Sequence, residues 1–281
     1  MNNENQISLQ KILVPIDGSH ASLHAQEVVV PLARSFDSKV KILHVVPRGL
    51  LKANVSPTFK GNLQSILEQK GRKIVGDAHS LYVEEGIPLE TEIIEYGDPA
   101  DFILNLCGQY DLTVLGGRGE GPTKEFALGS VAEKVIRHNK CPTLVVKKRK
   151  LLSKILVIVD DSDSSKTALH YAIELAKIQK GELTLLNAVR RLPLALKEES
   201  AKKNSKDILE ESSKIVEAQG LTAKARTALG PPAQVITTIA DEEDCSLVVM
   251  GRRSRRGIKR FMSGGVSEKV VHNAKTSVMV V

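Results

Sequence analysis

The sequence has no tryptophan, and aromatic residues make up only 3% of its 281 positions. Proteins that bind single-stranded nucleic acids without sequence preference stack successive bases on aromatic side chains. This scarcity disfavours a nucleic acid as the partner, although the formal net charge of the chain is +7.

Cysteine is also scarce, and its spacing excludes two kinds of site. Cys107, Cys141 and Cys245 are an odd number and form no CxxC pair, so we expect neither a disulfide framework nor a zinc site. Cys107 and Cys141 are interpreted as small core residues rather than as reactive thiols. The reducing conditions of the cytoplasm fit this cysteine usage.

Long apolar runs are missing as well. The longest, such as "LTLL" and "LVVM", are far shorter than the roughly 20 residues that span a bilayer. The segment "MNNENQISLQK" lacks the apolar stretch of an export signal. We therefore expect a cytoplasmic protein without a membrane partner, and its 42% hydrophobic and 26% charged residues are typical of globular domains.

What the sequence does contain is an internal repeat. Three segments of the first half recur in the second half: 11–25 with 154–168, 97–103 with 230–236, and 129–146 with 264–281. The first pair shares eight of its fifteen positions, and the last pair shares eight of its eighteen. The repeat predicts two tandem copies of one domain, residues 1–147 and 154–281, joined by "KKRKLLS".

Each copy alternates short β-branched apolar runs with longer helical patterns, which predicts βαβ units and an α/β fold with helices on both faces of a parallel sheet. In the first copy we expect strands near 11–16, 40–45, 90–95, 111–115 and 142–146, and helices near 20–35, 58–85, 99–107 and 129–138. In the second copy we expect strands near 154–159, 183–188, 223–228, 246–250 and 277–281, and a long helix within 192–220.

Five apolar residues of the segment 59–86 recur at near-helical spacing and are expected to pack on the core. They are Leu63, Ile66, Leu67, Ile74 and Leu81.

The stretch "GGRGEGPTKEFALGS" (116–130) joins a buried strand to a helix. In open α/β sheets, ligands bind outside the carboxyl ends of the strands. The first amides of the helix have no partner within it, and its dipole favours a phosphate group. Gly116 and Gly119 are expected to let the backbone approach a ligand and adopt φ > 0, and Ser130 would add a hydroxyl group.

This spacing, G-x-x-G followed by nine residues and then G-S, resembles that of the universal stress protein family. The segments "VPIDGS" and "LHVV" strengthen the resemblance, which covers nearly the whole chain in two copies. It implies an open five-stranded parallel sheet of order 3-2-1-4-5 in each copy. It also implies a nucleotide-dependent sensor or regulator of the stress response that binds ATP, AMP or ADP, with or without Mg²⁺, and acts on a protein partner.

Carried over residue by residue, the resemblance assigns Asp17 to the nucleoside, with Pro15 and Ile16 beside it, and the main chain of Val45 to adenine. The ribose and the phosphates fall to Gly116, Gly119, Gly129, Ser130 and Val131, and Arg118 is a candidate to pair with a phosphate.

Two of these residues also fit ordinary structural roles. Asp17 is suited to the start of a helix with Ser19 as its N-cap, and Arg118 equally fits an exposed loop. His44 ends a buried strand and is interpreted as structural.

No residue is assigned to catalysis. ATP hydrolysis needs a positioned base or a metal clamp, and only Asp17, Glu120 and Glu125 lie near the glycine loop. Neither a P-loop nor a dinucleotide-binding pattern is present. A slow ATPase or phosphotransferase, and a nucleotide-free interaction scaffold, are the alternatives to a sensor.

The second copy departs from the nucleotide pattern at two positions: Ser254 stands in the place of Gly119, and Gly265 stands in the place of Ser130. A serine at a position with φ > 0 is strained, and Gly265 has no hydroxyl group to offer. We therefore expect one working nucleotide site, in the first copy, although Asp160 repeats Asp17.

Two further features of the sequence bear on partners. The loop 252–260 is rich in arginine, and both an anion-binding loop and a solvated one remain open. The resemblance implies that "TLVVK" (143–147) and "SVMVV" (277–281) pair within the chain, so that one chain mimics a dimer and a homodimer of two chains is a further option. Pairing would cover two apolar strands that would otherwise be edges.

Overall fold

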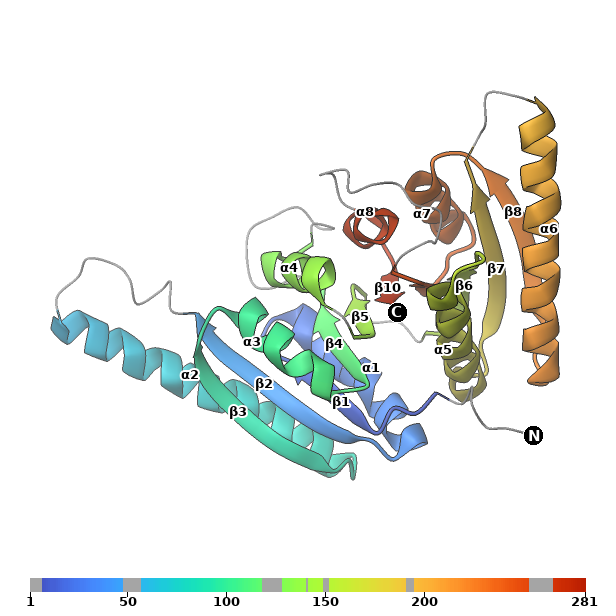
Figure 1. Ribbon diagram of the computed structural model, residues 1–281. Helices are drawn as coiled ribbons and strands as arrows, with labels where there is room; N and C mark the ends of the chain where they lie inside the picture. The colour runs from blue at the N-terminus through green and yellow to red at the C-terminus, as the bar shows by residue number, and fades with distance from the viewer. Residues whose placement is uncertain are drawn as a thin grey trace. The chain divides into compact units, whose positions relative to one another are not determined.

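The computed structural model of the chain describes residues 7–47, 57–117, 128–139, 141–148, 152–190, 195–252 and 265–281, without the side chains of 47, 57–60, 91–95 and 195–198. It divides into two compact units. We call Ser8–Arg149 the first domain and the unit that contains Lys150–Val281 the second domain (Figure 1).

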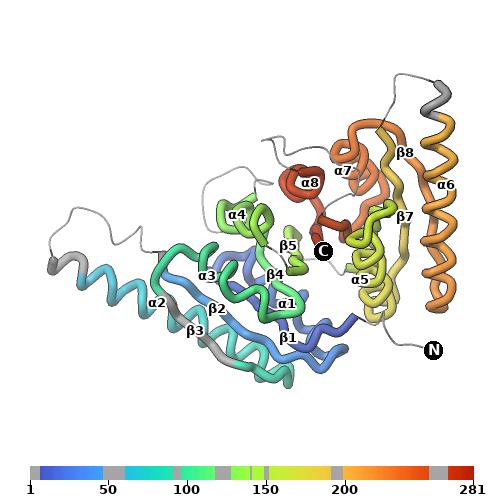
Figure 2. The backbone as a smooth tube through the Cα atoms, viewed as in Figure 1, coloured from blue at the N-terminus to red at the C-terminus, as the bar shows by residue number. Residues whose placement is uncertain are grey.

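Both domains alternate strands and helices along the chain, as the backbone trace shows (Figure 2). The first domain contains β1 (Lys11–Pro15), α1 (His20–Phe36), β2 (Lys39–Pro47), α2 (Pro57–Glu84), β3 (Leu89–Gly97), α3 (Pro99–Leu106), the short 3-10 helix η2 (Cys107–Gln109), β4 (Leu112–Gly116), α4 (Ser130–His138) and β5 (Thr143–Val146). The second domain contains β6 (Lys154–Ile158), α5 (Asp163–Gln179), β7 (Glu182–Val189), α6 (Ala195–Ala218), β8 (Ala223–Leu229), α7 (Pro232–Glu242), β9 (Leu247–Met250), α8 (Val266–Asn273) and β10 (Ser277–Val280). The predicted α/β class is confirmed.

Every strand pair within a domain is parallel. The strands of the first domain lie in the order β3-β2-β1-β4-β5, and those of the second domain lie in the order β8-β7-β6-β9-β10. The order in which the chain adds strands therefore reverses once in each sheet. The reversal lies between β1 and β4 in the first domain and between β6 and β9 in the second domain. Such a reversal is the place where open α/β sheets bind ligands.

The reversal also decides which helices share a face. Right-handed crossovers place α1 and α2 on one face of the first sheet and α3 and α4 on the other (Figure 1). In agreement, α1 contacts β1, β4 and β5, α2 contacts β2 and β3, and α3 contacts α4.

The first helix of each domain has local signals at both ends. The hydroxyl of Ser19 accepts a hydrogen bond from the main-chain N–H of Ser22, which confirms Ser19 as the N-cap of α1. The helix ends at Asp37, whose φ of 51° is left-handed. In the second domain Ser162 caps α5, and Lys180 ends it with φ 48°.

Leucine, isoleucine and valine side chains fill the space between the first sheet and α3 and α4. The cluster consists of Leu13, Leu43, Val45, Ala100, Ile103, Tyr110, Leu115, Ala132 and Val135, with Phe102, Leu106, Leu128 and Val131 packed against it. It joins both strands that flank the reversal to α4.

The prediction for the long helix α2 was wrong at one residue. Ile66 is 61% exposed, whereas the fully packed residues of α2 are Val75, Ala78 and Tyr82 near its C-terminal end. Figure 1 shows that the N-terminal end of α2 extends past the ends of the strands, and Leu63 and Leu67 on either side of Ile66 are only half-buried. Helical spacing alone cannot show where the sheet ends.

Tyr82 is a buried side chain with an unpaired polar atom. It is 0% exposed, and its hydroxyl group has no hydrogen-bond partner within the described part of the chain. Burial raises the pKa of this phenol. Since an unpaired buried hydroxyl costs stability, Tyr82→Phe is expected to raise the free energy of unfolding by about 1 kcal/mol, and Tyr82→Ala to lower it by about 3–5 kcal/mol. Urea denaturation measures both changes. A clear decrease in the free energy of unfolding of Tyr82→Phe would show that the hydroxyl group has a hydrogen-bond partner.

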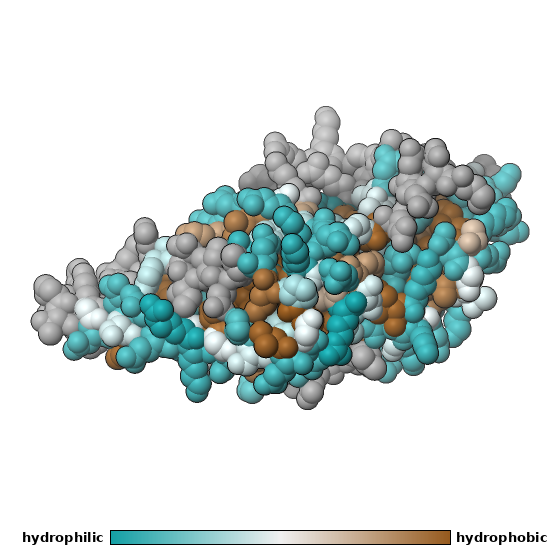
Figure 3. Space-filling view, turned by 90° about the horizontal axis from the view of Figure 1, so that it is seen from below, coloured by the Kyte–Doolittle hydropathy of each residue, from teal (hydrophilic) through white to brown (hydrophobic). Residues whose placement is uncertain are grey.

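Few of the described residues carry a large apolar side chain that is exposed. Among the described residues, Leu23, Ile66 and Val83 are the exposed ones, and on the face drawn in Figure 3 hydrophilic side chains surround smaller hydrophobic areas. Within the same part of the chain, no helix combines the length and the apolar character needed to cross a bilayer.

Candidate functional site

The candidate site lies at the carboxyl edge of the first sheet, where β1 and β4 end side by side. Pro15 ends β1, with Ile16 and Asp17 following it, and Gly116 ends β4. α4 begins at the same edge, since the N–H of Gly129 donates to the carbonyl of Gly117 over 2.8 Å. The fold thus brings together the described residues that the sequence assigned to nucleoside and phosphates.

The end of β1 is tied to β2 by two contacts. The N–H of Ile16 donates to the carbonyl of Leu43 over 2.8 Å, and Nδ1 of His44 donates to the carbonyl of Ile16 over 2.9 Å. His44 is buried, and its hydrogen bond to Ile16 gives it a structural role.

The main chain of Val45 lies beyond the hydrogen bonds that join β1 to β2. Residues two apart in a strand turn their main-chain groups to the same side, so Val45 follows Leu43 in facing the β1 side. Pairing between β1 and β2 ends at Leu43. The peptide groups of Val45 therefore face the space past the end of β1, while its side chain is buried in the core.

Asp17 makes a local contact and remains exposed. Its Oδ1 accepts a hydrogen bond from the main-chain N–H of Ser19 over 2.9 Å, which is the contact of an acid at the start of a helix. A carboxylate has two oxygens, and this contact uses one of them. The structural role expected for Asp17 is therefore present and is compatible with a ligand role.

Gly116 corrects one prediction. It lies in β4, and its φ is outside the left-handed region expected for it. A Cβ atom at this position would lie 2.6 Å from the main-chain carbon of Ala21 and 2.8 Å from the main-chain nitrogen of Ser22. Glycine is needed here because the first turn of α1 packs against the end of β4, and not for an unusual backbone conformation.

The start of α4 has the features of an anion site. Gly129 is the N-cap with φ −68° and ψ 147°, and no side chain caps the helix. Ser130 is the first helical residue and is exposed. Val131 packs against the cluster that contains Val45. The first-turn amides, the hydroxyl of Ser130 and the helix dipole favour a negatively charged group at this end.

Several predicted residues lie outside the described part of the chain. They are Arg118 and Gly119 of the first glycine loop, Glu120 and Glu125 beside them, and Ser254 with most of the arginine-rich loop 252–260. Their assignments stay predictions.

Lys147 is a neighbour of the site that the sequence analysis missed. It follows β5, and a Cβ atom on Gly117 would lie 2.9 Å from its Cγ. Burial lowers the pKa of the Lys147 ammonium group to about 8. In the sequence this residue is the first of the basic residues of "KKRKLLS", and nothing there distinguishes it from a solvated linker lysine.

The cysteines of the first domain are core residues, as predicted. Cys107 and Cys141 are both buried. Sγ of Cys107 lies 2.6 Å from Oδ1 of Asn139, and Nδ2 of Asn139 lies 3.2 Å from Sγ of Cys141. Among the residues that the structure describes, no group of three or more histidine, cysteine, aspartate or glutamate side chains is placed to hold a metal ion.

The second domain repeats the structural contacts of this edge. Oδ1 of Asp160 accepts from the N–H of Ser162 over 2.8 Å, as Asp17 does from Ser19. Asn187 takes the place of His44 and donates to the carbonyl of Val159 over 2.6 Å.

The start of α8 differs from the start of α4. Gly265 is the N-cap and Val266 is the first helical residue, so no hydroxyl group stands at the position of Ser130. Ser267 is buried instead, and its hydroxyl donates to the carbonyl of Arg252 over 3.5 Å.

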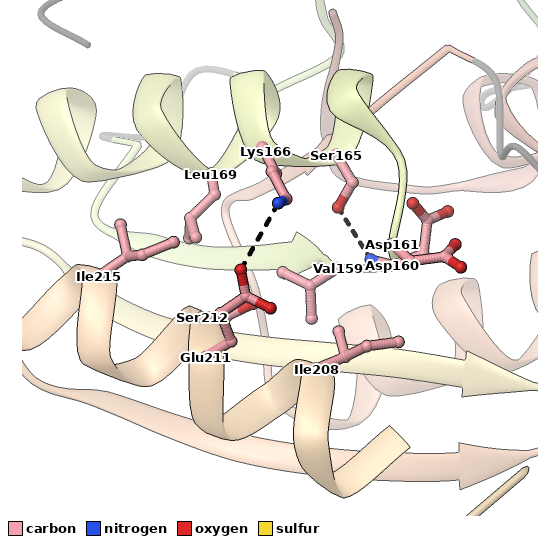
Figure 4. A pocket seen from close by; sticks show the side chains of 10 residues that line it. All are labelled: Val159, Asp160, Asp161, Ser165, Lys166, Leu169, Ile208, Glu211, Ser212 and Ile215. Carbon is pink, nitrogen blue, oxygen red and sulfur yellow. Dashed lines mark hydrogen bonds and ion pairs between the residues drawn. The ribbon is translucent and has the colours of Figure 1, made fainter. Parts of the chain in front are cut away.

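A cleft beside Asp160 separates α5 from α6 (Figure 4). Lys166 of α5 reaches toward Glu211 of α6 with 3.5 Å between Nζ and Oε1, and Asp160 and Asp161 lie together at the other end. The volume is about 80 Å³, whereas pockets for drug-sized ligands hold about 300–1,000 Å³. The cleft is too small for a nucleotide.

Each domain is an open parallel α/β sheet whose strand order reverses once, and ligands of such sheets bind at the carboxyl edge beside that reversal. The sequence profile of the universal stress protein family matches residues 8–147 and 152–281. The chain belongs to this family, with two tandem domains.

Known relatives agree with this assignment. A universal stress protein of Methanocaldococcus jannaschii is 34% identical over 150 residues, which cover 50% of this chain and 84% of that protein. One of Mycolicibacterium smegmatis is 24% identical over 286 residues, 96% of each chain. The crystal structure of a universal stress protein from Archaeoglobus fulgidus has a TM-score of 0.75 at 22% identity and covers 96% of this chain and 97% of its own. At that identity the likeness shows the fold alone.

Proposed function

We propose that the first domain binds an adenine nucleotide, ATP or its AMP and ADP products, and that the protein reports nucleotide state to a protein partner in the cytoplasmic stress response. The observation that carries the proposal is the convergence of Asp17, the main chain of Val45 and the uncapped start of α4 at one strand reversal.

Each part suits one part of the nucleotide. The peptide groups of Val45 face the space past β1 and can pair with the edge of an adenine ring. The carboxylate of Asp17 accepts hydrogen bonds from ribose hydroxyls. The amides of Ser130 and Val131 in the first turn of α4 and the helix dipole stabilise phosphate oxygens. Mg²⁺, when bound, would neutralise phosphate charge. Asp17, which directly follows the end of β1, is the described carboxylate that would hold it.

The second domain is proposed to bind nucleotide weakly or not at all. Its helix α8 begins with Gly265 and Val266, and thus lacks a hydroxyl group where α4 has Ser130. The hydroxyl of Ser267 is directed to the protein's own main chain. One nucleotide site per chain follows from this difference.

Isothermal titration with ATP and with AMP tests the proposal. We expect a stoichiometry near one nucleotide per chain. Asp17→Asn is expected to weaken ATP binding about tenfold or more, since hydrogen bonds to a charged group contribute roughly 1.5–3 kcal/mol. Ser130→Ala is expected to weaken it several-fold.

Asp160→Asn is the matched control. Asp160 makes the same main-chain contact as Asp17, to Ser162 instead of Ser19, so both variants exchange a charged acceptor for a neutral one at this contact. ATP affinity should stay at the wild-type value in Asp160→Asn. Two equal sites per chain, or equal losses in both variants, would contradict the proposed asymmetry, and an absence of ATP and AMP binding would remove the proposed function.

A further inference from the structure

Lys147 leaves the first sheet on the face that α4 covers. Alternate side chains of a strand point to the same face. Leu115 packs in one cluster with Ala132 and Val135 of α4, so position 117, two residues further along, faces α4 as well. A Cβ atom on Gly117 would lie 2.9 Å from Cγ of Lys147. The stem of Lys147 therefore lies on the α4 side of the sheet.

The neighbouring glycine confirms this direction. A Cβ atom on Gly116 would meet the main chain of Ala21 in α1, and α1 covers the opposite face. The ladder between β4 and β5 continues to the next residue, since the N–H of Gly117 donates to the carbonyl of Val146 over 2.7 Å. Positions 116 and 117 thus point to opposite faces, as they do in a regular strand.

Gly117 also connects Lys147 to the start of α4. The carbonyl of Gly117 accepts a hydrogen bond from the N–H of Gly129, the N-cap of α4, over 2.8 Å. The stem of Lys147 thus packs on the residue that holds this helix start. A positively charged side chain and the positive end of the helix dipole lie at the same edge of the sheet.

The place of this lysine is costly for the protein without a ligand. Lys147 is half-buried, whereas the next residue, Lys148, is exposed. Burial lowers the pKa of the Lys147 ammonium group to about 8, because it disfavours the charged form. A phosphate group beside the ammonium group would offset this cost by an attraction between opposite charges. A half-buried positive charge at a ligand edge therefore favours an anionic ligand.

The strand order places Lys147 at the far end of the proposed nucleotide site. Along the carboxyl edge the strands follow the order β2, β1, β4 and β5, and they end near Val45, Asp17, Gly117 and Lys147. Neighbouring strands lie about 4.8 Å apart, so this edge spans roughly 14 Å from β2 to β5. A nucleotide with its adenine at Val45 and its ribose at Asp17 therefore directs its phosphates toward β5.

We infer that Lys147 binds the phosphates beyond the first one and thereby makes the first domain prefer ATP to AMP, an inference that rests on the nucleotide site proposed above. The first phosphate lies at the start of α4 in this arrangement, where the amides of Ser130 and Val131 hold it. The ammonium group of lysine binds phosphate as a point charge. AMP has no group that reaches Lys147.

Isothermal titration of the full chain with ATP and with AMP, in the wild type and in Lys147→Met, tests the inference. Methionine keeps an unbranched stem over Gly117 and removes the charge. The dissociation constant for ATP is expected to rise at least about tenfold, because a hydrogen bond between charged groups is lost. The dissociation constant for AMP should change less than about twofold, because AMP does not make this contact.

Lys148→Met is the matched control. It removes the same charge from the next residue, so the weaker attraction that any nearby positive charge exerts on ATP is lost in both variants. ATP affinity should stay within about twofold of the wild-type value in Lys148→Met, since Lys148 is exposed and its charge is screened by salt. Lys147→Arg keeps the charge and should keep most of the preference for ATP. Circular dichroism checks that each variant is folded.

Three results would overturn the inference and leave the nucleotide site in place. They are equal losses for ATP and AMP in Lys147→Met, an unchanged ATP affinity in that variant, and an equal loss in Lys148→Met. Asp17→Asn separates the inference from the proposed function, because ATP and AMP both contain the ribose and both should bind more weakly. A wild-type protein that binds neither nucleotide would remove the proposed function and this inference with it.

Discussion

Gly116→Ala is expected to lower the free energy of unfolding by about 3 kcal/mol, the upper end of the usual cost of overpacking. The added methyl group would lie 2.6 Å from the main-chain carbon of Ala21, and main chain cannot rotate away as a side chain can. The end of β4 must then separate from α1. Urea denaturation followed by circular dichroism measures the loss.

The same substitution should also weaken ATP binding. Gly116 directly precedes Gly117, whose carbonyl holds the N–H of Gly129 at the start of α4. A shift of β4 would move that helix start relative to Asp17. Titration under conditions in which the variant is fully folded separates this effect from the loss of stability.

Two glycines serve as controls. Gly251→Ala should cost about as much as Gly116→Ala, because a Cβ atom there would lie 2.8 Å from the main-chain carbon of Ser164. Gly61 lies in α2 with no atom within 4 Å of an added Cβ, so Gly61→Ala should raise stability by about 0.5–1 kcal/mol. Wild-type stability in Gly116→Ala would show that β4 and α1 are not in close contact.

Lys147→Met is expected to stabilise the protein at neutral pH and to lose this advantage in alkali. Burial lowers the pKa of Lys147 from 10.5 to about 8. Between these values the unfolded chain binds a proton that the folded chain does not, so the stability of the wild type rises with pH through this window. Below about pH 8 the cost of burying the charge is fully present. At about 1.4 kcal/mol per pKa unit, the variant should gain up to about 3 kcal/mol at pH 7 and almost nothing near pH 10.5.

Denaturation of wild type and variant at pH 7, 8, 9 and 10 checks this prediction. Methionine retains the unbranched stem that packs over Gly117 and removes only the charged end. Lys148→Met serves as the control, because Lys148 is exposed and a surface substitution usually changes stability by less than about 0.5 kcal/mol. A stability difference for Lys147→Met that is constant with pH would contradict the buried charge.

Much of the candidate site could be predicted from the sequence, because its signals are local or repeated. Asp17 and Ser19 stand in a segment that recurs around Asp160 and Ser162, and both pairs make the expected contacts. Gly129 and Ser130 lie at the start of a helix, as their spacing indicates. The conformation of Gly116 could not be predicted, because its need for glycine arises from α1, about 95 residues earlier in the chain.

The sequence by itself determined that this protein consists of two α/β domains with helices and strands in a fixed alternation, because hydrophobic period, helix caps and an internal repeat are properties of neighbouring residues. Only the tertiary structure decided that Ile66 is exposed, that Lys147 is half-buried beside Gly117, and that Gly116 packs against the first turn of α1. Those outcomes depend on which distant segments meet, and the burial and free volume of a side chain are set by its neighbours in space.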